Sequence, residues 1–184
     1  MKRSSLWWVA LSATLIAADR PPRWPSESVY HLVSRWTDQA GKQAPLSRFA
    51  GHPVLLAMVY TQCEASCPIT VSQMRAIEAK LSPKAREAVR LVLVSFDPAR
   101  DTRERLAEVA AERHLGSPRW TLLTGAQDQV DELAVVLGFK YQRLEGGDFS
   151  HSNLLTVLGP DGVIRGQLNG LGQDPQGLIE AIQR

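Results

Sequence analysis

The stretch VLLAMVYTQCEASCPIT, residues 54–70, decides the fold expected for this chain. Residues 54–60 form a continuous apolar run, which is typical of a β-strand buried on both faces of a sheet. Pro68 suits the first position of a helix. The apolar residues that follow it at helical spacing are Val71, Met74, Ile77 and Leu81. The stretch therefore predicts a strand, a short loop with two cysteines, and a helix.

The rest of the chain alternates between strand-like and helix-like segments. The other predicted strands are residues 29–36, 90–96, 120–123, 154–158 and 163–168, with a GPDG turn joining the last two into an antiparallel hairpin. The predicted helices carry Leu106, Val109 and Ala110; Val130, Leu133, Ala134 and Leu137; and Leu178, Ile179 and Ile182. The predicted helix starts are Asp101 with Glu104, Thr124 with Gln127, and Asp174 with Pro175, and the predicted ends are Gly116 and Gly138. This order predicts an α/β fold with a central mixed β-sheet flanked by helices on both faces, which is the outline of a thioredoxin-like domain.

Length and charge limit the possible functions. The chain has 184 residues, which is the length of one domain with a single core. Apart from Lys2 and Arg3, it carries nineteen basic and nineteen acidic side chains, and no basic stripe. A neutral body of this kind gives no reason to expect nucleic acid as a partner.

The N-terminus has the pattern of an export signal. Lys2 and Arg3 precede an apolar run of about 13 residues, which is shorter than the roughly 17–25 residues of a membrane span. Residues 1–18 are therefore predicted to be a signal peptide, with a short uncleaved anchor as the alternative. Residues 19–28, which contain three prolines, are predicted to be a linker, and residues 29–184 the folded domain. Outside the cytosol, two thiols can be oxidised to a disulfide.

The only two cysteines, Cys63 and Cys67, stand four residues apart in the loop and at the expected start of the helix. Because Pro68 disfavours helical geometry in the residue before it, Cys67 is expected at the helix cap and Cys63 in the loop. The helix dipole favours thiolates at this position. Two thiolates can exchange with disulfides or hold a soft metal, but they do not complete a closed zinc site of four ligands. Copper accepts two thiolates with an imidazole.

One of the four histidines is a candidate for that imidazole. His31, His52 and His114 are expected at the surface, in a turn or at a helix end. His151 lies in FSHSN directly before the predicted strand 154–158, at the sheet edge nearest the cysteine loop in a thioredoxin-like layout. Spacing alone leaves two interpretations open for His151, a metal ligand or an incidental loop residue.

Three motifs in order resemble the Sco/SenC family of copper proteins: YTQCEASCP (60–68), VSFDPARDT (94–102) and HSNLLTVLGPDG (151–162). The resemblance extends from about Trp36 to Gly170. It implies a thioredoxin-like domain that binds one copper ion, Cu(I) or Cu(II), through Cys63, Cys67 and His151. It also implies an exported and often membrane-tethered protein, periplasmic or on the outer face of the inner membrane and expected to be monomeric. The implied partner is cytochrome c oxidase subunit II, or another copper or thiol protein.

Some positions leave alternatives. Glu64 stands where the family often has proline, and Gly146 with Gly147 suggests a loop that could move His151 relative to the sulfurs. Asp97 is expected mainly to end a strand, with an outer-shell acceptor or weak fourth ligand as a second possibility.

A second function is a thiol–disulfide oxidoreductase without metal, in which Cys63 attacks and Cys67 resolves. Against it, FSHSNLLTV lacks the proline that thioredoxin-type enzymes carry before the strand facing the active site. A peroxidase is less favoured, because Thr61 stands only two residues before Cys63 where peroxiredoxin-type sites have a threonine three before. A disulfide that only staples the loop would stabilise little, because the ring is small. The sequence therefore favours a metallochaperone and leaves enzymatic activity, as thiol reduction, open.

Overall fold

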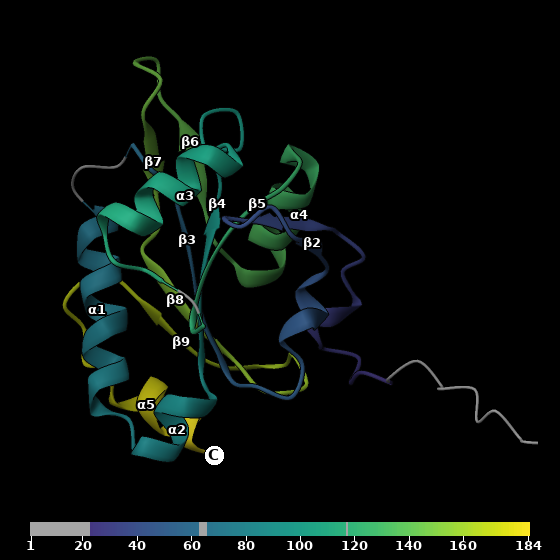
Figure 1. The fold of residues 1–184 in the computed structure, drawn as a ribbon, viewed down its shortest axis with the longest axis vertical. Helices are drawn as coiled ribbons and strands as arrows, with labels where there is room; N and C mark the ends of the chain where they lie inside the picture. The colour runs from purple at the N-terminus through teal and green to yellow at the C-terminus, as the bar shows by residue number, and fades with distance from the viewer. Residues whose placement is uncertain (1–22, 63–65, 117) are drawn as a thin grey trace, which may run out of the picture.

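The computed structural model describes residues 23–62, 66–116 and 118–184, and a seven-stranded mixed sheet forms its centre (Figure 1). The strands of this sheet, in spatial order, are β2 (Gln43–Ala44), β1 (Trp36–Asp38), β5 (Trp120–Thr124), β4 (Arg90–Ser95), β3 (Val54–Val59), β8 (Leu154–Leu158) and β9 (Ile164–Asn169). The three middle strands β5, β4 and β3 are parallel, and the outer pairs are antiparallel. The predicted mixed sheet is confirmed.

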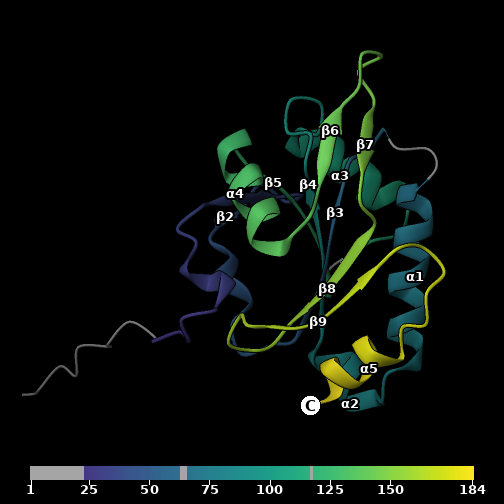
Figure 2. The same cartoon turned by 180° about the vertical axis from the view of Figure 1, so that it is seen from behind.

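Helices cover both faces of the sheet, as predicted. The helices are α1 (Ser66–Lys80), α2 (Pro83–Ala88), α3 (Arg103–Glu112), α4 (Gln127–Leu137) and α5 (Gln176–Gln183), with short 3-10 helices η1 (Val29–His31) and η2 (Leu46–Phe49). Apolar residues of α1, α2, α3 and α5 form one core cluster with the sheet, and those of α4, η1 and η2 form the other. Figure 2 shows the molecule from behind, with α5 beside α2 and the C-terminus.

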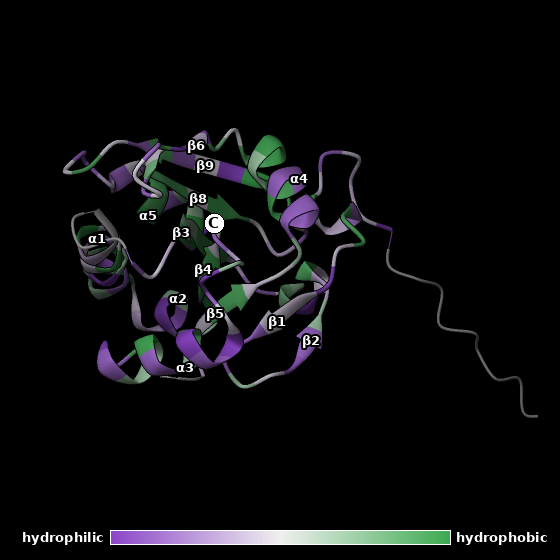
Figure 3. Ribbon diagram, turned by 90° about the horizontal axis from the view of Figure 1, so that it is seen from above, coloured by the Kyte–Doolittle hydropathy of each residue, from purple (hydrophilic) through white to green (hydrophobic). Residues whose placement is uncertain are grey.

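The central strands alternate their side chains between the two cores. In β3, Leu55 and Ala57 belong to the cluster under α1, whereas Leu56 and Met58 belong to the cluster under α4. This alternation requires apolar residues at every position, because successive side chains of a strand point to opposite faces. Figure 3 shows these central strands as largely hydrophobic and the helices as mixed along their length.

The N-terminal part of the described chain differs from the prediction. Residues 29–35 do not form a strand: Val29–His31 is a 3-10 helix, at whose N-cap the Ser28 side chain accepts a hydrogen bond from the Tyr30 amide, and β1 begins only at Trp36. The expected signal or anchor, residues 1–18, lies outside the described residues. Within the described part of the chain, no helix is both long enough and apolar enough to cross a bilayer.

Three helix ends differ from the prediction. The α3 N-cap is Thr102 rather than Asp101, and the helix ends at Glu112, with Arg113 as its C-cap, rather than at Gly116. The α4 N-cap is Ala126, whose amide bonds to Gln129, rather than Thr124. The predicted start of α5 at Asp174 and Pro175 is confirmed, because its N-cap is Pro175. The predicted end of α4 is confirmed, because Gly138 takes the left-handed conformation with φ 71°.

Several elements were not predicted from the sequence: the short β2, η2 and α2, and a two-stranded hairpin of β6 (Tyr141–Arg143) and β7 (Phe149–His151). Among the described residues, the two hairpin strands pair only with each other and form a sheet separate from the large one, projecting above it in Figure 1. Gly147 takes a positive φ of 81° in the turn between them. The loop that was expected to bend at Gly146 and Gly147 is therefore the turn of this hairpin.

Candidate metal centre

The described segments that flank the candidate residues meet at one edge of the sheet. The parallel strands β3 and β4 end together at this edge, with Val59 paired to Ser95, and lead into the cysteine loop and into Asp97. Strand β8 runs antiparallel to β3, so its beginning, three residues after His151, lies at the same edge. The edge is the carboxyl end of the parallel strands, where α/β proteins generally bind ligands.

The two cysteines can be placed only in part. Cys63 lies outside the described residues, as does the side chain of Cys67. Helix α1 begins at Ser66, so Cys67 is in its first turn rather than at the cap, and Pro68 is the third residue. Proline is tolerated there because the first amides of a helix have no partner within the helix.

His151 is the last residue of β7 and is held on an aromatic surface. Its ring lies 5.2 Å from the Phe96 ring, 5.9 Å from the Tyr60 ring and 6.1 Å from the Phe139 ring, measured between centroids. Its Nδ1 lies 2.9 Å from the Ser152 carbonyl oxygen. A carbonyl only accepts, so Nδ1 carries the proton, and Nε2 is the nitrogen with a lone pair in the neutral ring. This is the arrangement by which proteins orient an imidazole that binds a metal.

Tyr60, the residue after β3, links the cysteine loop to the hairpin. It is buried, and its ring packs against Phe96 at 5.1 Å and Phe149 at 5.2 Å. Its hydroxyl donates a hydrogen bond to Asp148, and this bond is the main reason that the pKa of the Asp148 carboxyl is lowered. Periodicity predicted a buried apolar run here, but it could not predict the pairing with Asp148, because that pairing joins residues 88 positions apart.

Asp97, the suggested outer-shell residue, is only 1% exposed and has an arginine on each carboxylate oxygen. Arg100 Nε donates to Oδ2, and Arg143 Nη2 donates to Oδ1 at 3.1 Å. The Asp97 amide donates a hydrogen bond to the Ser95 hydroxyl at 3.0 Å. Arg100 and Arg143 were not predicted, because no local pattern marks an arginine that pairs across the fold.

Asp101, predicted as a helix cap, is a fully buried carboxylate beneath the cysteine loop. It accepts hydrogen bonds from the Thr61 amide at 3.0 Å, from the Thr61 hydroxyl at 2.5 Å and from the Ser95 hydroxyl at 2.6 Å. Burial raises the pKa of the Asp101 carboxyl, and the bonds from Ser95 and Thr61 oppose that rise. Asp101 thus fixes the start of the loop two residues before Cys63.

The other histidines make ordinary structural contacts. Nε2 of the exposed His31 lies 2.8 Å from the Pro25 carbonyl. Nδ1 of His52 lies 3.1 Å from the Ala88 carbonyl and its Nε2 lies 3.2 Å from Arg90. His114 is exposed and takes a positive φ of 52° after α3. Each of these three lies at a different part of the fold from the aromatic surface under His151.

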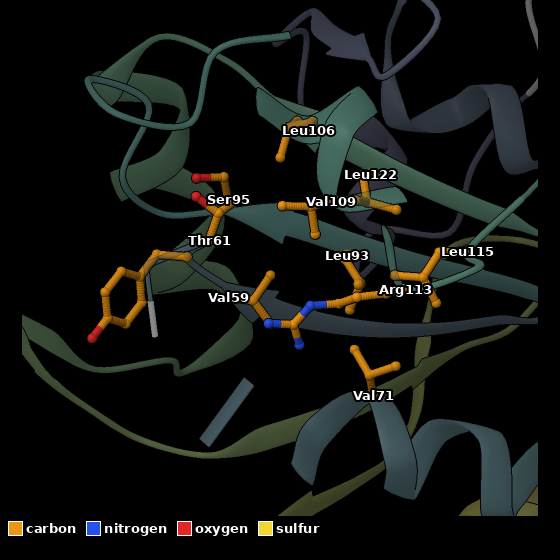
Figure 4. A pocket seen from close by; sticks show the side chains of 11 residues that line it. Val59, Thr61, Val71, Leu93, Ser95, Leu106, Val109, Arg113, Leu115 and Leu122 are labelled. Atoms are coloured by element: carbon orange, nitrogen blue, oxygen red, sulfur yellow. The ribbon is translucent and has the colours of Figure 1, made fainter. Parts of the chain in front are cut away.

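A small apolar cavity lies between the sheet, α1 and α3 (Figure 4). Its lining includes Val59 and Thr61 before the cysteine loop, Val71 of α1, Val109 of α3 and the Arg113 side chain. At about 20 Å³ it has room for about one water molecule. It is too small to hold an organic substrate.

Comparison with known proteins bears on the family and the fold. The SCO1/SenC family model matches residues 30–184. A protein of Stutzerimonas stutzeri that is named as copper-binding is 32% identical over 179 residues, which are 90% of this chain and 86% of that protein. The solved structure of BsSco, described as a disulfide-switch member of the Sco family of cytochrome c oxidase assembly proteins, is 29% identical. It has a TM-score of 0.68 and covers 81% of this chain and 88% of its own.

A more distant solved structure shows the fold alone. Arabidopsis thaliana ScoI with copper bound has a TM-score of 0.69 and 22% identity, over 82% of this chain and 96% of its own. Together these similarities confirm the thioredoxin-like architecture predicted from the sequence.

Proposed function

Because the chain belongs to the SCO1/SenC family, we propose that it is an exported copper chaperone with one copper site formed by Cys63, Cys67 and His151. It delivers copper to, or prepares the cysteines of, the copper site on cytochrome c oxidase subunit II. The N-terminal segment directs it to the periplasm or tethers it to the outer face of the inner membrane, where it acts as a monomer.

One observation carries this proposal: the His151 ring is seated at the sheet edge from which the cysteine loop departs. Nδ1 is oriented toward the Ser152 carbonyl and the ring rests on Phe96 and Tyr60. The copper-binding name of the 32% identical relative supports the same metal. Two thiolates and one imidazole suit Cu(I), and an added oxygen or water suits Cu(II).

Copper is the cargo of this site, and the surrounding residues have supporting roles. Asp101 holds Thr61 and so the beginning of the cysteine loop. Asp97 acts as an outer-shell residue rather than as a ligand, since both of its oxygens are engaged by arginines. Release would occur when thiolates of the partner replace the chaperone's ligands one at a time.

A thiol–disulfide reductase is the second candidate, and the disulfide switch of the 29% identical BsSco favours keeping it. In this reaction the Cys63 thiolate attacks a partner disulfide, forms a mixed disulfide and releases one partner thiolate. Cys67 then attacks the mixed disulfide and releases the second thiolate. The partner gains two electrons and the chain is left with a Cys63–Cys67 disulfide.

Copper titration of the reduced protein against a chromophoric chelator tests the proposal. We expect one copper ion per chain, and a loss of affinity of at least about a hundredfold in His151→Ala, because losing a ligand costs more than the 10–100-fold of an outer-shell change. Cys63→Ser should lose binding as well. His31→Ala, which changes an exposed histidine, is the matched control and should bind as the wild type does.

Unchanged affinity in His151→Ala would reject His151 as a ligand. If the wild-type protein ignores copper at micromolar concentration but reduces a disulfide substrate, the reductase replaces the chaperone as the function.

A further inference from the structure

The hairpin that carries His151 needs a support outside the main sheet. Its strands β6 and β7 pair only with each other, in three residue pairs that end with Tyr141 opposite His151. An isolated two-stranded hairpin is marginally stable in water. The position of His151 therefore depends on the contacts that hold this hairpin to the rest of the domain.

One of those contacts is the ion pair between Arg143 of β6 and Asp97. Arg143 Nη2 lies 3.1 Å from Asp97 Oδ1, and the two residues are 46 positions apart in the chain. The arginine side chain is 51% exposed, whereas that of Asp97 is 1% exposed. The Arg143 guanidinium also lies 4.7 Å from the centre of the Phe149 ring, directly across the hairpin. Arg143 thus pairs with the buried Asp97 carboxylate and also packs on the Phe149 ring of the same hairpin.

The same carboxylate is connected to the cysteine loop. Arg100 donates from Nε to Asp97 and from Nη1 to the Gln62 side chain at 2.8 Å. Gln62 directly precedes Cys63 in the sequence. The Arg100 guanidinium also lies 5.9 Å from the Tyr60 ring and 5.4 Å from the Phe149 ring. Through Arg100 and Arg143, Asp97 therefore connects the segment that leads into the cysteines with the hairpin that carries His151.

We propose that Arg143 is a positioning residue for copper binding, which holds the His151 hairpin at a fixed place relative to the cysteine loop through Asp97 and Arg100. This inference rests on the proposed copper site. Arg143 does not touch the metal; it restricts the motion of the ligand-bearing strand. The arrangement keeps the imidazole near its binding position before copper arrives, which lowers the ordering cost of binding.

Arg143→Met tests this role, because methionine keeps an apolar stem for the contact with Phe149 but removes the charge and the donors. The first measurement is hydrogen–deuterium exchange of the amides of residues 141–151 in the reduced, copper-free protein. We expect exchange about tenfold faster, since a hydrogen bond to a charged group stabilises by an amount of that order. Arg143→Lys, which keeps the charge, should recover part of the protection.

Arg165→Met is the matched control. Arg165 is 49% exposed and pairs with Asp161 at 2.6 Å, in the turn region of the other hairpin, β8–β9. Arg165→Met also removes an arginine–aspartate ion pair from a similarly exposed arginine, with an aspartate that is 33% exposed, and exchange of residues 141–151 should not change.

The second measurement is the electron paramagnetic resonance spectrum and the affinity of bound Cu(II). Arg143→Met should weaken affinity about tenfold, in the range of other changes that act through a ligand's support, and reduce the nitrogen coupling from His151. If the amides of residues 141–151 exchange as slowly in Arg143→Met as in Arg165→Met, Arg143 does not hold the hairpin and the proposal is wrong. Faster exchange with an unchanged Cu(II) spectrum and affinity would overturn the positioning role. If wild-type protein binds no copper, the proposed function fails, whereas the exchange data still decide whether Arg143 holds the hairpin.

Discussion

At the scale of single residues, the two carboxylates of the DPARD segment, Asp97 and Asp101, have different kinds of partner. Asp97 faces two arginines, whereas Asp101 accepts hydrogen bonds from the Thr61 amide and from the hydroxyls of Thr61 and Ser95. A buried carboxylate with neutral donors loses much of its hydration without gaining an opposite charge. Burial therefore dominates at Asp101 and raises the pKa of its carboxyl.

This raised pKa predicts a particular pH dependence of stability. The folded protein binds the Asp101 proton more tightly than the unfolded chain, so the stabilisation is present at low pH and is lost as the pH rises through the native pKa. Asp101→Asn has no such titration. We expect the free energy of unfolding of Asp101→Asn, relative to wild type, to increase with pH above about 4, by about 1.4 kcal/mol for each unit by which the native pKa is raised.

Urea unfolding at a series of pH values from 4 to about 8 measures this difference. Glu132→Gln, which changes an exposed carboxylate of α4, is the control. Parallel stability profiles for Asp101→Asn and wild type would show that the Asp101 carboxyl titrates alike in both states, contrary to the prediction.

At the scale of the elements, the two glycines predicted to end helices turn out to differ. Gly138 follows α4 with φ 71°, and its amide bonds to the carbonyls of the last helical turn. Gly116 lies beyond the end of α3 and has no positive φ. Only the first requires a residue without a Cβ, because the left-handed region is costly for other residues.

Gly138→Ala should therefore destabilise the protein by about 1 kcal/mol, the cost of placing alanine in the left-handed region. Gly116→Ala is the matched control, and a Cβ at either glycine meets no atom within 4 Å in the described structure. The comparison isolates backbone conformation from crowding. Thermal or urea unfolding of both variants measures the effect, and equal stability of the two would refute it.

At the scale of the whole molecule, a sheet with two apolar faces divides the core into two clusters. Leu133 of α4 is completely buried in one of them, whereas Val135, two residues along the same helix, is 80% exposed. The periodicity of the helix thus separates a position that closes the core from one that faces solvent.

Leu133→Ala should lower the free energy of unfolding by about 2–5 kcal/mol, because it removes buried methyl groups and leaves a cavity. Val135→Ala on the same helix should change it by less than about 0.5 kcal/mol. Urea denaturation at neutral pH compares the two. A loss at Leu133 no larger than that at Val135 would contradict the assignment of α4 as the cover of this face.

The sequence by itself determined the features that depend on neighbours in the chain. Periodicity within residues 54–60 and 71–81 was enough for β3 and α1, and the order of three motifs was enough for the family. It placed His151 before β8, at the sheet edge where the cysteine loop begins. Local signals failed at residues 29–31, which form a 3-10 helix capped by the Ser28 side chain.

Only the tertiary structure decided what surrounds the site. Arg143 reaches Asp97 across 46 residues, and Tyr60 reaches Asp148 across 88. Asp101 has the spacing of a helix cap, but its carboxylate lies in the interior and accepts hydrogen bonds from the Thr61 and Ser95 hydroxyls. Such pairs leave no periodic pattern, because their energy comes from charges and donors that meet only after the sheet has formed. The candidate ligands could be predicted from the sequence, whereas the residues that surround and support them are identified only by the tertiary structure.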